Sequence, residues 1–197
     1  MTWKLIAFLV LILVLSVGGC SSGRAEAILA YNDGVSLTEQ GLHAESISHY
    51  DKAIQLDSKF AMAYINRGVA YENLGESHIA ISDYDKAIEI DPNDSRAYRN
   101  RGFAYDVLGQ YQRALQDYDK AIEIDPTASR AYVNRGLVYG NVSQHQRAIQ
   151  DFDRAIQLDP NYAIAYNNRG IIYGNLGQDE KEDADEAKAC SLDSRFC

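Results

Sequence analysis

The stretch from Asn100 to Pro126 reads NRGFAYDVLGQYQRALQDYDKAIEIDP, and the stretch from Asn134 to Pro160 reads NRGLVYGNVSQHQRAIQDFDRAIQLDP. The second stretch restates the first after 34 residues, since 134 − 100 = 34. Glycines recur in this register at Gly34, Gly68, Gly102, Gly136 and Gly170. Alanines keep step with them at Ala53, Ala87, Ala121, Ala155 and Ala189. A strict period of this length indicates an array of repeats, each of which buries its apolar face on its neighbours.

Each repeat is predicted to form two amphipathic helices, because apolar and small residues recur at spacings of three and four. In the third repeat we expect the first helix from Ser95 to Leu108. It ends at Gly109, whose missing Cβ permits the left-handed conformation that closes a helix. The second helix is expected from Gln112 to Ile124. It stops before Asp125 and Pro126, because proline disfavours helical geometry in the residue before it.

The repeat closely resembles the tetratricopeptide repeat. In the third unit the matching positions are Tyr98, Gly102, Tyr105, Ala114, Tyr118, Ala121 and Pro126. The resemblance implies an all-α, right-handed superhelical solenoid of five helix-turn-helix units, at residues 27–60, 61–94, 95–128, 129–162 and 163–196. The last unit has Glu182 and Glu186 where alanine and an aromatic residue are expected, so we interpret it as a cap with a degenerate second helix.

A charge pattern repeats with the same period. An arginine precedes each of four repeat glycines, and an aspartate follows it sixteen residues later, in the pairs Arg67 and Asp83, Arg101 and Asp117, Arg135 and Asp151, and Arg169 and Asp185. In the first unit the corresponding residues are Asp33 and His49, so the acidic and basic types are exchanged. This exchange predicts that the two positions touch across each hairpin, which assigns the arginines to structure.

The first 26 residues are interpreted as a targeting segment. Lys4 precedes an apolar run from Leu5 to Val17, which at about 1.5 Å per residue is too short to span a bilayer as a helix. The sequence VGGC that follows resembles the lipobox of bacterial lipoproteins. By that resemblance residues 1–19 are a signal peptide, Cys20 is acylated, and residues 20–26 form the anchor and tether. A plain secreted protein and a signal-anchored protein remain the alternatives.

Candidate binding residues come from the family resemblance, which implies that the first helices of successive units line a concave groove for a peptide or a partner helix. The sixth position of every unit is an asparagine, in the series Asn32, Asn66, Asn100, Asn134 and Asn168. A carboxamide both donates and accepts, so this asparagine ladder is suited to bind a peptide backbone. The alternative is that these side chains bond only within the scaffold.

The ninth position is apolar throughout, with Val35, Val69, Phe103, Leu137 and Ile171. We expect this stripe to be half core and half groove floor. Three arginines, Arg96, Arg99 and Arg130, also fall on groove positions. They are suited to hold a carboxylate or an acidic segment of a partner, although a solvated face is slightly favoured as their explanation.

Several function classes are disfavoured. The formal net charge of −9 opposes binding to nucleic acid. The histidines His43, His49, His78 and His145 occur singly, without paired metal-ligand spacing, and no catalytic motif is present, so we expect neither a cofactor nor enzymatic activity. Cys190 and Cys197 could form a disulfide in an oxidising compartment. The alternative is that Cys190 is a free, small, buried residue.

The sequence therefore predicts a non-catalytic adaptor that gathers other cell-envelope proteins. It would be anchored to a bacterial membrane by lipid on Cys20. The expected location is the outer membrane, with the protein facing the periplasm. A pilus or secretin assembly lipoprotein is one alternative, and a signal-anchored cytoplasmic regulator is another. The sequence names no particular partner and no oligomeric state.

Overall fold

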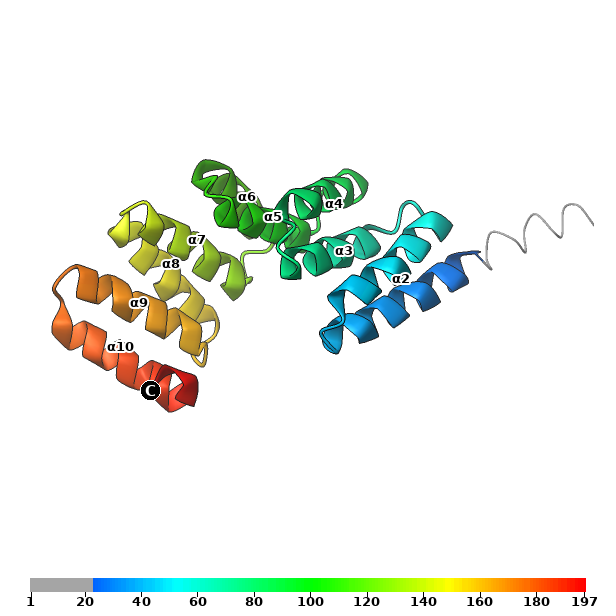
Figure 1. Cartoon of the computed structure of the whole chain (residues 1–197). Coiled ribbons are helices and arrows are strands. Elements are labelled where there is room, and N and C mark those ends of the chain that lie inside the picture. The colour runs from blue at the N-terminus through cyan, green and yellow to red at the C-terminus, as the bar shows by residue number, and fades with distance from the viewer. Residues whose placement is uncertain (1–22) are drawn as a thin grey trace, which may run out of the picture. The chain divides into compact units, whose positions relative to one another are not determined.

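A computed structural model of the chain describes residues 23–197, and Figure 1 draws them in chain order from blue to red. The predicted signal peptide and the lipidation site Cys20 lie outside the described residues and stay predictions. Every element from residue 23 onward is helical, which confirms the all-α prediction. The chain divides into two compact units, one up to Pro92 and the other from Asn93 to Cys197, and each is described by itself.

In the first unit, helices pack in sequence. A helix over residues 23–39 is followed by α2 (His43–Leu56), α3 (Ala61–Asn73) and α4 (Ser77–Ile90). Helices α3 and α4 form a hairpin, and α2 packs on α3. The core of this unit is made of small and aromatic residues such as Tyr50, Ala53, Ala63 and Tyr84, which are fully or almost fully buried.

The second unit contains three hairpins. These are α5 (Ser95–Val107) with α6 (Tyr111–Ile124), α7 (Ser129–Asn141) with α8 (His145–Leu158), and α9 (Ala163–Asn175) with α10 (Asp179–Leu192). Helices α6 and α8 pack on the next hairpin through α7 and α9. The first helices also meet directly, because α7 contacts both α5 and α9. The exposed side of α5, α7 and α9, which we call the first-helix face, is therefore one continuous surface within this unit.

The repeat glycines position the two helices of each hairpin. A Cβ built on Gly68 would lie 2.6 Å from Cε1 of Tyr84, and one built on Gly102 would lie 3.0 Å from Cε1 of Tyr118. The aromatic ring of the second helix thus rests directly on the backbone of the first. The repeated alanines are fully buried in the same interior, at Ala53, Ala87, Ala121, Ala155 and Ala189.

Helix ends follow the sequence expectation closely. Gly109 has a φ of 71° and closes α5, as do the glycines at the same position of three other repeats. In the fourth repeat Ser143 occupies this position and still adopts a left-handed φ of 60°. The second helices α4, α6 and α8 each end with a single residue between the helix and the proline that follows, at Pro92, Pro126 and Pro160.

The chain ends in a short 3₁₀ helix, η1 (Ser194–Phe196), which packs on α10. A disulfide joins Cys190 on α10 to Cys197 just after η1. Of the two alternatives left by the sequence, the structure therefore has the disulfide. The covalent link holds the C-terminal residues against the last helix.

Candidate functional site

The predicted arginine–aspartate pairs are confirmed. Arg101 on α5 donates from Nε to Oδ2 of Asp117 at 2.8 Å and from Nη2 to Oδ1 at 2.7 Å. The same two-pronged geometry joins Arg67 to Asp83, Arg135 to Asp151 and Arg169 to Asp185. In the first unit the exchanged pair also meets, with Nδ1 of His49 3.7 Å from Oδ2 of Asp33.

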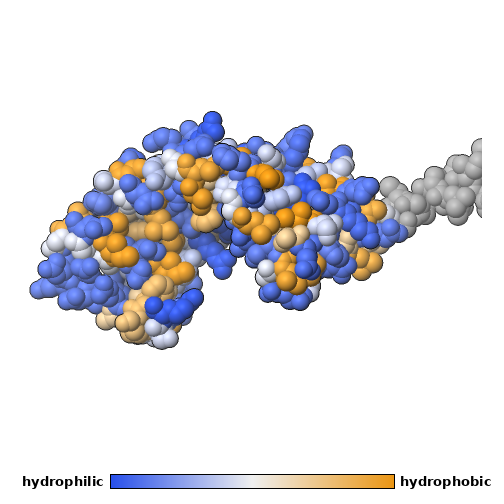
Figure 2. Space-filling view, viewed as in Figure 1, coloured by the Kyte–Doolittle hydropathy of each residue, from blue (hydrophilic) through white to orange (hydrophobic). Residues whose placement is uncertain are grey.

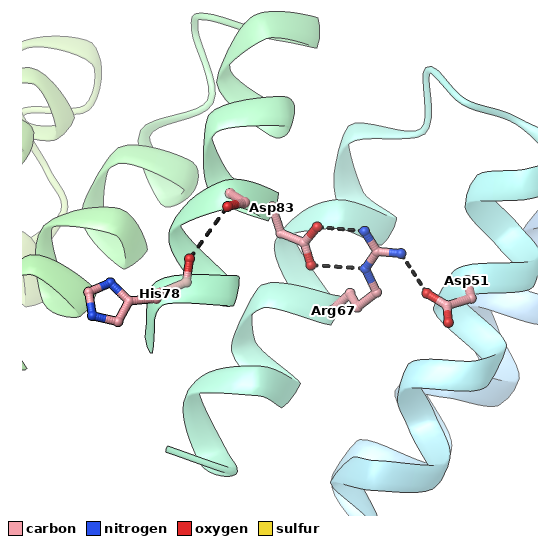
Figure 3. Close-up of polar contacts among 5 residues, drawn as sticks. Asp51, Arg67, His78 and Asp83 are labelled. Carbon is pink, nitrogen blue, oxygen red and sulfur yellow. Dashed lines mark hydrogen bonds and ion pairs between the residues drawn. The ribbon is translucent and has the colours of Figure 1, made fainter. Parts of the chain in front are cut away.

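A second aspartate also binds these arginines, and it comes from the preceding repeat. Figure 3 shows Arg67 between Asp83 of its own hairpin and Asp51 of α2. Nη1 of Arg135 likewise donates to Asp119 at 2.6 Å, and Nη1 of Arg169 donates to Asp153. Sequence reasoning missed this contact. Its signal was present, because Asp51, Asp85, Asp119 and Asp153 repeat every 34 residues.

The ion pairs make the repeat arginines part of the scaffold. Hydrogen bonds to Asp83 raise the pKa of Arg67 above its ordinary value, against the opposing effect of burial. The Asp83 carboxylate is almost completely buried and Asp51 is half exposed, so one guanidinium links an inner and an outer acid. These arginines are fully occupied inside the repeats, which leaves the remaining face residues as candidates for binding.

The asparagine ladder is partly engaged in hydrogen bonds within the protein. Nδ2 of Asn66 donates to the Tyr31 hydroxyl at 2.9 Å, and Oδ1 of Asn100 accepts from Nη2 of Arg99 at 3.1 Å. Nδ2 of Asn168 donates to the Ile164 carbonyl at 2.9 Å. Each carboxamide keeps further donor or acceptor capacity, since it has two N–H groups and two acceptor lone pairs. Asn32, the first member, is exposed on the helix over residues 23–39, and Asn134 is half-buried on α7.

The apolar stripe is most exposed in the second unit. Phe103 is 46% exposed, Leu137 37% and Ile171 48%, whereas Val35 and Val69 of the first unit are half-buried. Figure 2 shows apolar side chains interspersed with polar ones on the visible surface. Because α7 contacts α5 and α9, these three apolar side chains lie on neighbouring helices at the same repeat position. Single exposed apolar residues are common, but a set at one position on contiguous helices indicates a contact surface.

The three groove arginines lie at the beginning of α5 and α7. Arg96 is exposed and pairs with Asp94, which accepts from its Nη2 at 2.6 Å. Arg99 is half-buried one turn further along α5, and Arg130 is exposed on α7. The pKa of Arg99 is lowered, first by burial and then by the nearby charges of Arg130 and Arg96. The structure thus brings the three predicted arginines into one cluster.

An acidic group lies further along the same helix. Asp106 is half-buried towards the end of α5, and its pKa is raised by burial, with a hydrogen bond from Asn141 of α7 acting in the opposite direction. The face is therefore basic where α5 begins and acidic where α5 ends. Sequence reasoning did not single out Asp106, because its partner Asn141 belongs to the next repeat.

The described residues show neither a metal site nor a membrane span. Over residues 23–197, no group of three or more His, Cys, Asp or Glu side chains is placed to hold a metal ion. Over the same range no helix combines the length and the apolar character needed to cross a bilayer. The chemistry available on the first-helix face is hydrogen bonding, charge and apolar contact, which are the means of recognising another polypeptide.

These features define a helical repeat protein with an exposed first-helix face. Family models agree with the repeat structure: a tetratricopeptide repeat model matches residues 61–94, 95–128 and 129–162, a TPR repeat model matches residues 34–75, and another tetratricopeptide repeat model matches residues 152–184. The chain belongs to the tetratricopeptide repeat family. Members of this family typically act as scaffolds for protein interactions. No curated protein sequence matches the chain.

Several solved structures share this fold. MamA of Desulfovibrio magneticus RS-1, solved from residue 41 to its end, is 22% identical with a TM-score of 0.74, and the match covers 86% of this chain and 96% of the solved MamA chain. PilF of Pseudomonas aeruginosa is 21% identical with a TM-score of 0.79, covering 86% of this chain and 78% of PilF. YrrB, described as a TPR protein with an unusual peptide-binding site, is 24% identical with a TM-score of 0.66, covering 90% of this chain and 92% of YrrB.

Proposed function

We propose that this protein is a membrane-anchored, non-catalytic adaptor that binds other cell-envelope proteins along its first-helix face. The observation that carries the proposal is the exposure of Phe103, Leu137 and Ile171 on helices that touch one another. Asparagines of the ladder lie on the same helices, so the face offers apolar contact beside hydrogen-bonding groups. This combination suits a polypeptide ligand better than a small molecule, which prefers an enclosed cavity.

The proposed location is the periplasmic side of a bacterial membrane, expected to be the outer membrane. The lipobox-like sequence before Cys20 supports acylation at that residue. The disulfide between Cys190 and Cys197 supports an oxidising compartment, because such bonds are rare in the cytoplasm. Acyl chains on Cys20 would keep the repeats at the membrane surface, since each buried CH₂ contributes about 0.8 kcal/mol.

Metabolic labelling with an alkyne fatty acid tests the anchor. We expect label on the wild-type chain and none on Cys20→Ser, which should leave the membrane fraction. Label that persists on Cys20→Ser would overturn acylation at Cys20. A Cys190 that reacts with alkylating reagent without prior reduction would favour the signal-anchored cytoplasmic regulator.

Site-specific photo-crosslinking in intact cells tests the adaptor role. A crosslinker at Phe103 or Ile171 should yield discrete protein adducts. The matched control is Gln116, which is exposed on the second helix α6 of the same hairpin as Phe103. Adducts of equal yield and identity from Gln116, or no adducts from the two face positions, would contradict binding along this face.

A role in pilus assembly is a second candidate. The folds of PilF and of PilW, the latter described as a widely conserved type IV pilus biogenesis factor, are similar to this chain at 20–21% identity. Identity at this level shows the fold alone. Deletion of the gene should abolish surface pili if this candidate is right, and normal piliation would exclude it.

A further inference from the structure

Arg99 is a half-buried cation without an acidic partner. Its Nη2 and Nε atoms donate only to the neutral Oδ1 of Asn100, at 3.1 and 3.4 Å. Among residues 23–197, no carboxylate lies within ion-pair distance of Arg99 or of Arg130. The other half-buried arginines of the repeats differ, since Arg67, Arg135 and Arg169 each hold two aspartates.

The groups around Arg99 do not form an ion pair with it. Arg96 and Arg130 add two more guanidiniums close to Arg99. Asp94 is a nearby carboxylate, and it is held by Arg96. It accepts from the Arg96 backbone N–H and Nε at 2.9 Å, and from Nη2 at 2.6 Å. Arg99 and Arg130 are therefore the two arginines of the cluster that have no carboxylate at ion-pair distance among residues 23–197.

Such an arrangement favours an anionic ligand. Like charges in a partly desolvated position disfavour one another, and an arriving carboxylate relieves this through charge-assisted hydrogen bonds. The chain as a whole carries a formal charge of −9, so the cluster is opposite in sign to the rest of the protein. The attraction of an acidic ligand therefore comes from the arginines of α5 and α7 and not from the charge of the whole chain.

Apolar contact is available beside the cluster. Phe103 lies one helical turn beyond Arg99 on α5, and Leu137 lies about two turns beyond Arg130 on α7. Both side chains are exposed. A ligand that satisfies the arginines can thus place an apolar side chain over Phe103 and Leu137. At the far end of α5, Asp106 disfavours further acidic residues in that direction.

We propose that the first-helix face of the second unit selects an extended acidic segment of a partner protein, in which two neighbouring Asp or Glu side chains bind Arg99 and Arg130. An adjacent apolar side chain packs on Phe103 and Leu137. Two side-chain carboxylates provide one partner for each of Arg99 and Arg130, whereas a single chain-terminal carboxylate would provide a partner for only one of them. This inference rests on the proposed adaptor function, since it names the class of segment that the face would bind.

Fluorescence anisotropy on the full-length lipidated protein in detergent micelles tests the proposal. The probe is a short labelled peptide with two neighbouring aspartates followed by alternating leucine and serine, and its control has asparagines in place of the aspartates. We expect the aspartate peptide to bind at least about tenfold more tightly, because hydrogen bonds between charged groups are worth more than neutral ones. Its affinity should fall as salt is raised.

Arg130→Gln removes one exposed arginine of the cluster and should weaken binding of the aspartate peptide about tenfold, with little effect on the asparagine peptide. Arg154→Gln is the matched control, because Arg154 is exposed on α8 and bonds only to Gln157. It should leave both affinities unchanged. Arg99→Gln is the second variant, with thermal unfolding by circular dichroism as the check that it folds.

Equal binding of the two peptides, or an equal loss on Arg154→Gln, would overturn the acidic-segment proposal. The proposal would also be overturned if neither peptide bound. Self-association that Arg130→Gln abolishes would replace the acidic segment by a second copy of this chain. Tighter binding of a peptide whose only acid is its terminal carboxylate would replace it by a chain end. In all these cases crosslinking at Phe103 and Ile171 still decides the adaptor function separately.

Discussion

Gly136 and Phe152 are in direct contact across the α7–α8 hairpin: a Cβ built on Gly136 would lie 2.8 Å from Cε1 of the Phe152 ring. Glycine is favoured at this position because the Phe152 ring occupies the space that the Cβ of any other residue would need. In the last repeat the aromatic residue is absent, and a Cβ built on the equivalent Gly170 would lie 3.3 Å from its nearest neighbour, Cβ of Asp185. The same residue type thus has different packing in two repeats.

Gly136→Ala should destabilise the protein by about 1–2 kcal/mol. Overpacking costs about 1–3 kcal/mol, and the better helix propensity of alanine offsets up to about 1 kcal/mol of this. Gly170→Ala is the matched control and should be close to neutral, because the last repeat has no ring at this point. Urea unfolding followed by circular dichroism measures both. A larger loss for Gly170→Ala than for Gly136→Ala would show that the ring contact does not govern this position.

Arg135→Ala should lower the free energy of unfolding by about 3–5 kcal/mol, because it leaves the buried Asp151 carboxylate without its partner. Asp119→Ala removes the outer contact of the same arginine. Since Asp119 is 57% exposed, its removal should cost only about 0–1 kcal/mol. Thermal unfolding of the two variants measures the difference. Equal losses would mean that the inner and outer ion pairs are equivalent, contrary to their burial.

Ser143→Gly should stabilise the fourth repeat by about 0.5–1 kcal/mol. Ser143 has a φ of 60°, a conformation that costs a residue with a Cβ about 1–2 kcal/mol, and the greater freedom of glycine in the unfolded chain offsets part of the gain. The reverse change, Gly109→Ser, should destabilise at the equivalent position, where φ is 71°. Unfolding midpoints that move in the same direction for both variants would refute this conformational explanation.

Glu72→Gln should stabilise the protein at neutral pH by about 1 kcal/mol, and the gain should disappear in acid. Oε1 of Glu72 is buried without a hydrogen-bond partner among the described residues, and burial raises the pKa of this carboxyl above its ordinary value. The folded state therefore binds its proton more tightly than the unfolded state does. As pH rises from about 4.5 through the raised pKa, the wild type loses stability and the glutamine variant does not.

Unfolding curves at neutral pH and below about pH 4.5 measure this difference. Other carboxyl groups are common to both proteins, so their titration cancels when the two are compared at the same pH. A stabilisation by Glu72→Gln that is the same at both pH values would contradict a raised pKa for Glu72.

The repeat period and the hairpins could be predicted because each depends on local chemistry. The glycine at 109 ends a helix through its own φ, and the proline at 126 stops one through its own ring. The pairing of Arg101 with Asp117 was also predictable, because the separation of sixteen residues recurs and its acid and base are exchanged in the first unit. These relations lie within one repeat, where sequence distance and spatial distance correspond.

Tertiary packing determined the partners of the remaining side chains, because it decides which polar groups are buried and which neighbours can bond to them. Arg67 and Arg99 are both half-buried arginines on first helices, yet the first holds two aspartates and the second donates only to an asparagine. Asn66 and Asn100 read alike in the sequence, but one donates to Tyr31 and the other accepts from Arg99. The repeat therefore determines where the backbone of each such residue lies. The hydrogen bonds of its side chain depend on residues of the neighbouring helix, and these differ from one repeat to the next.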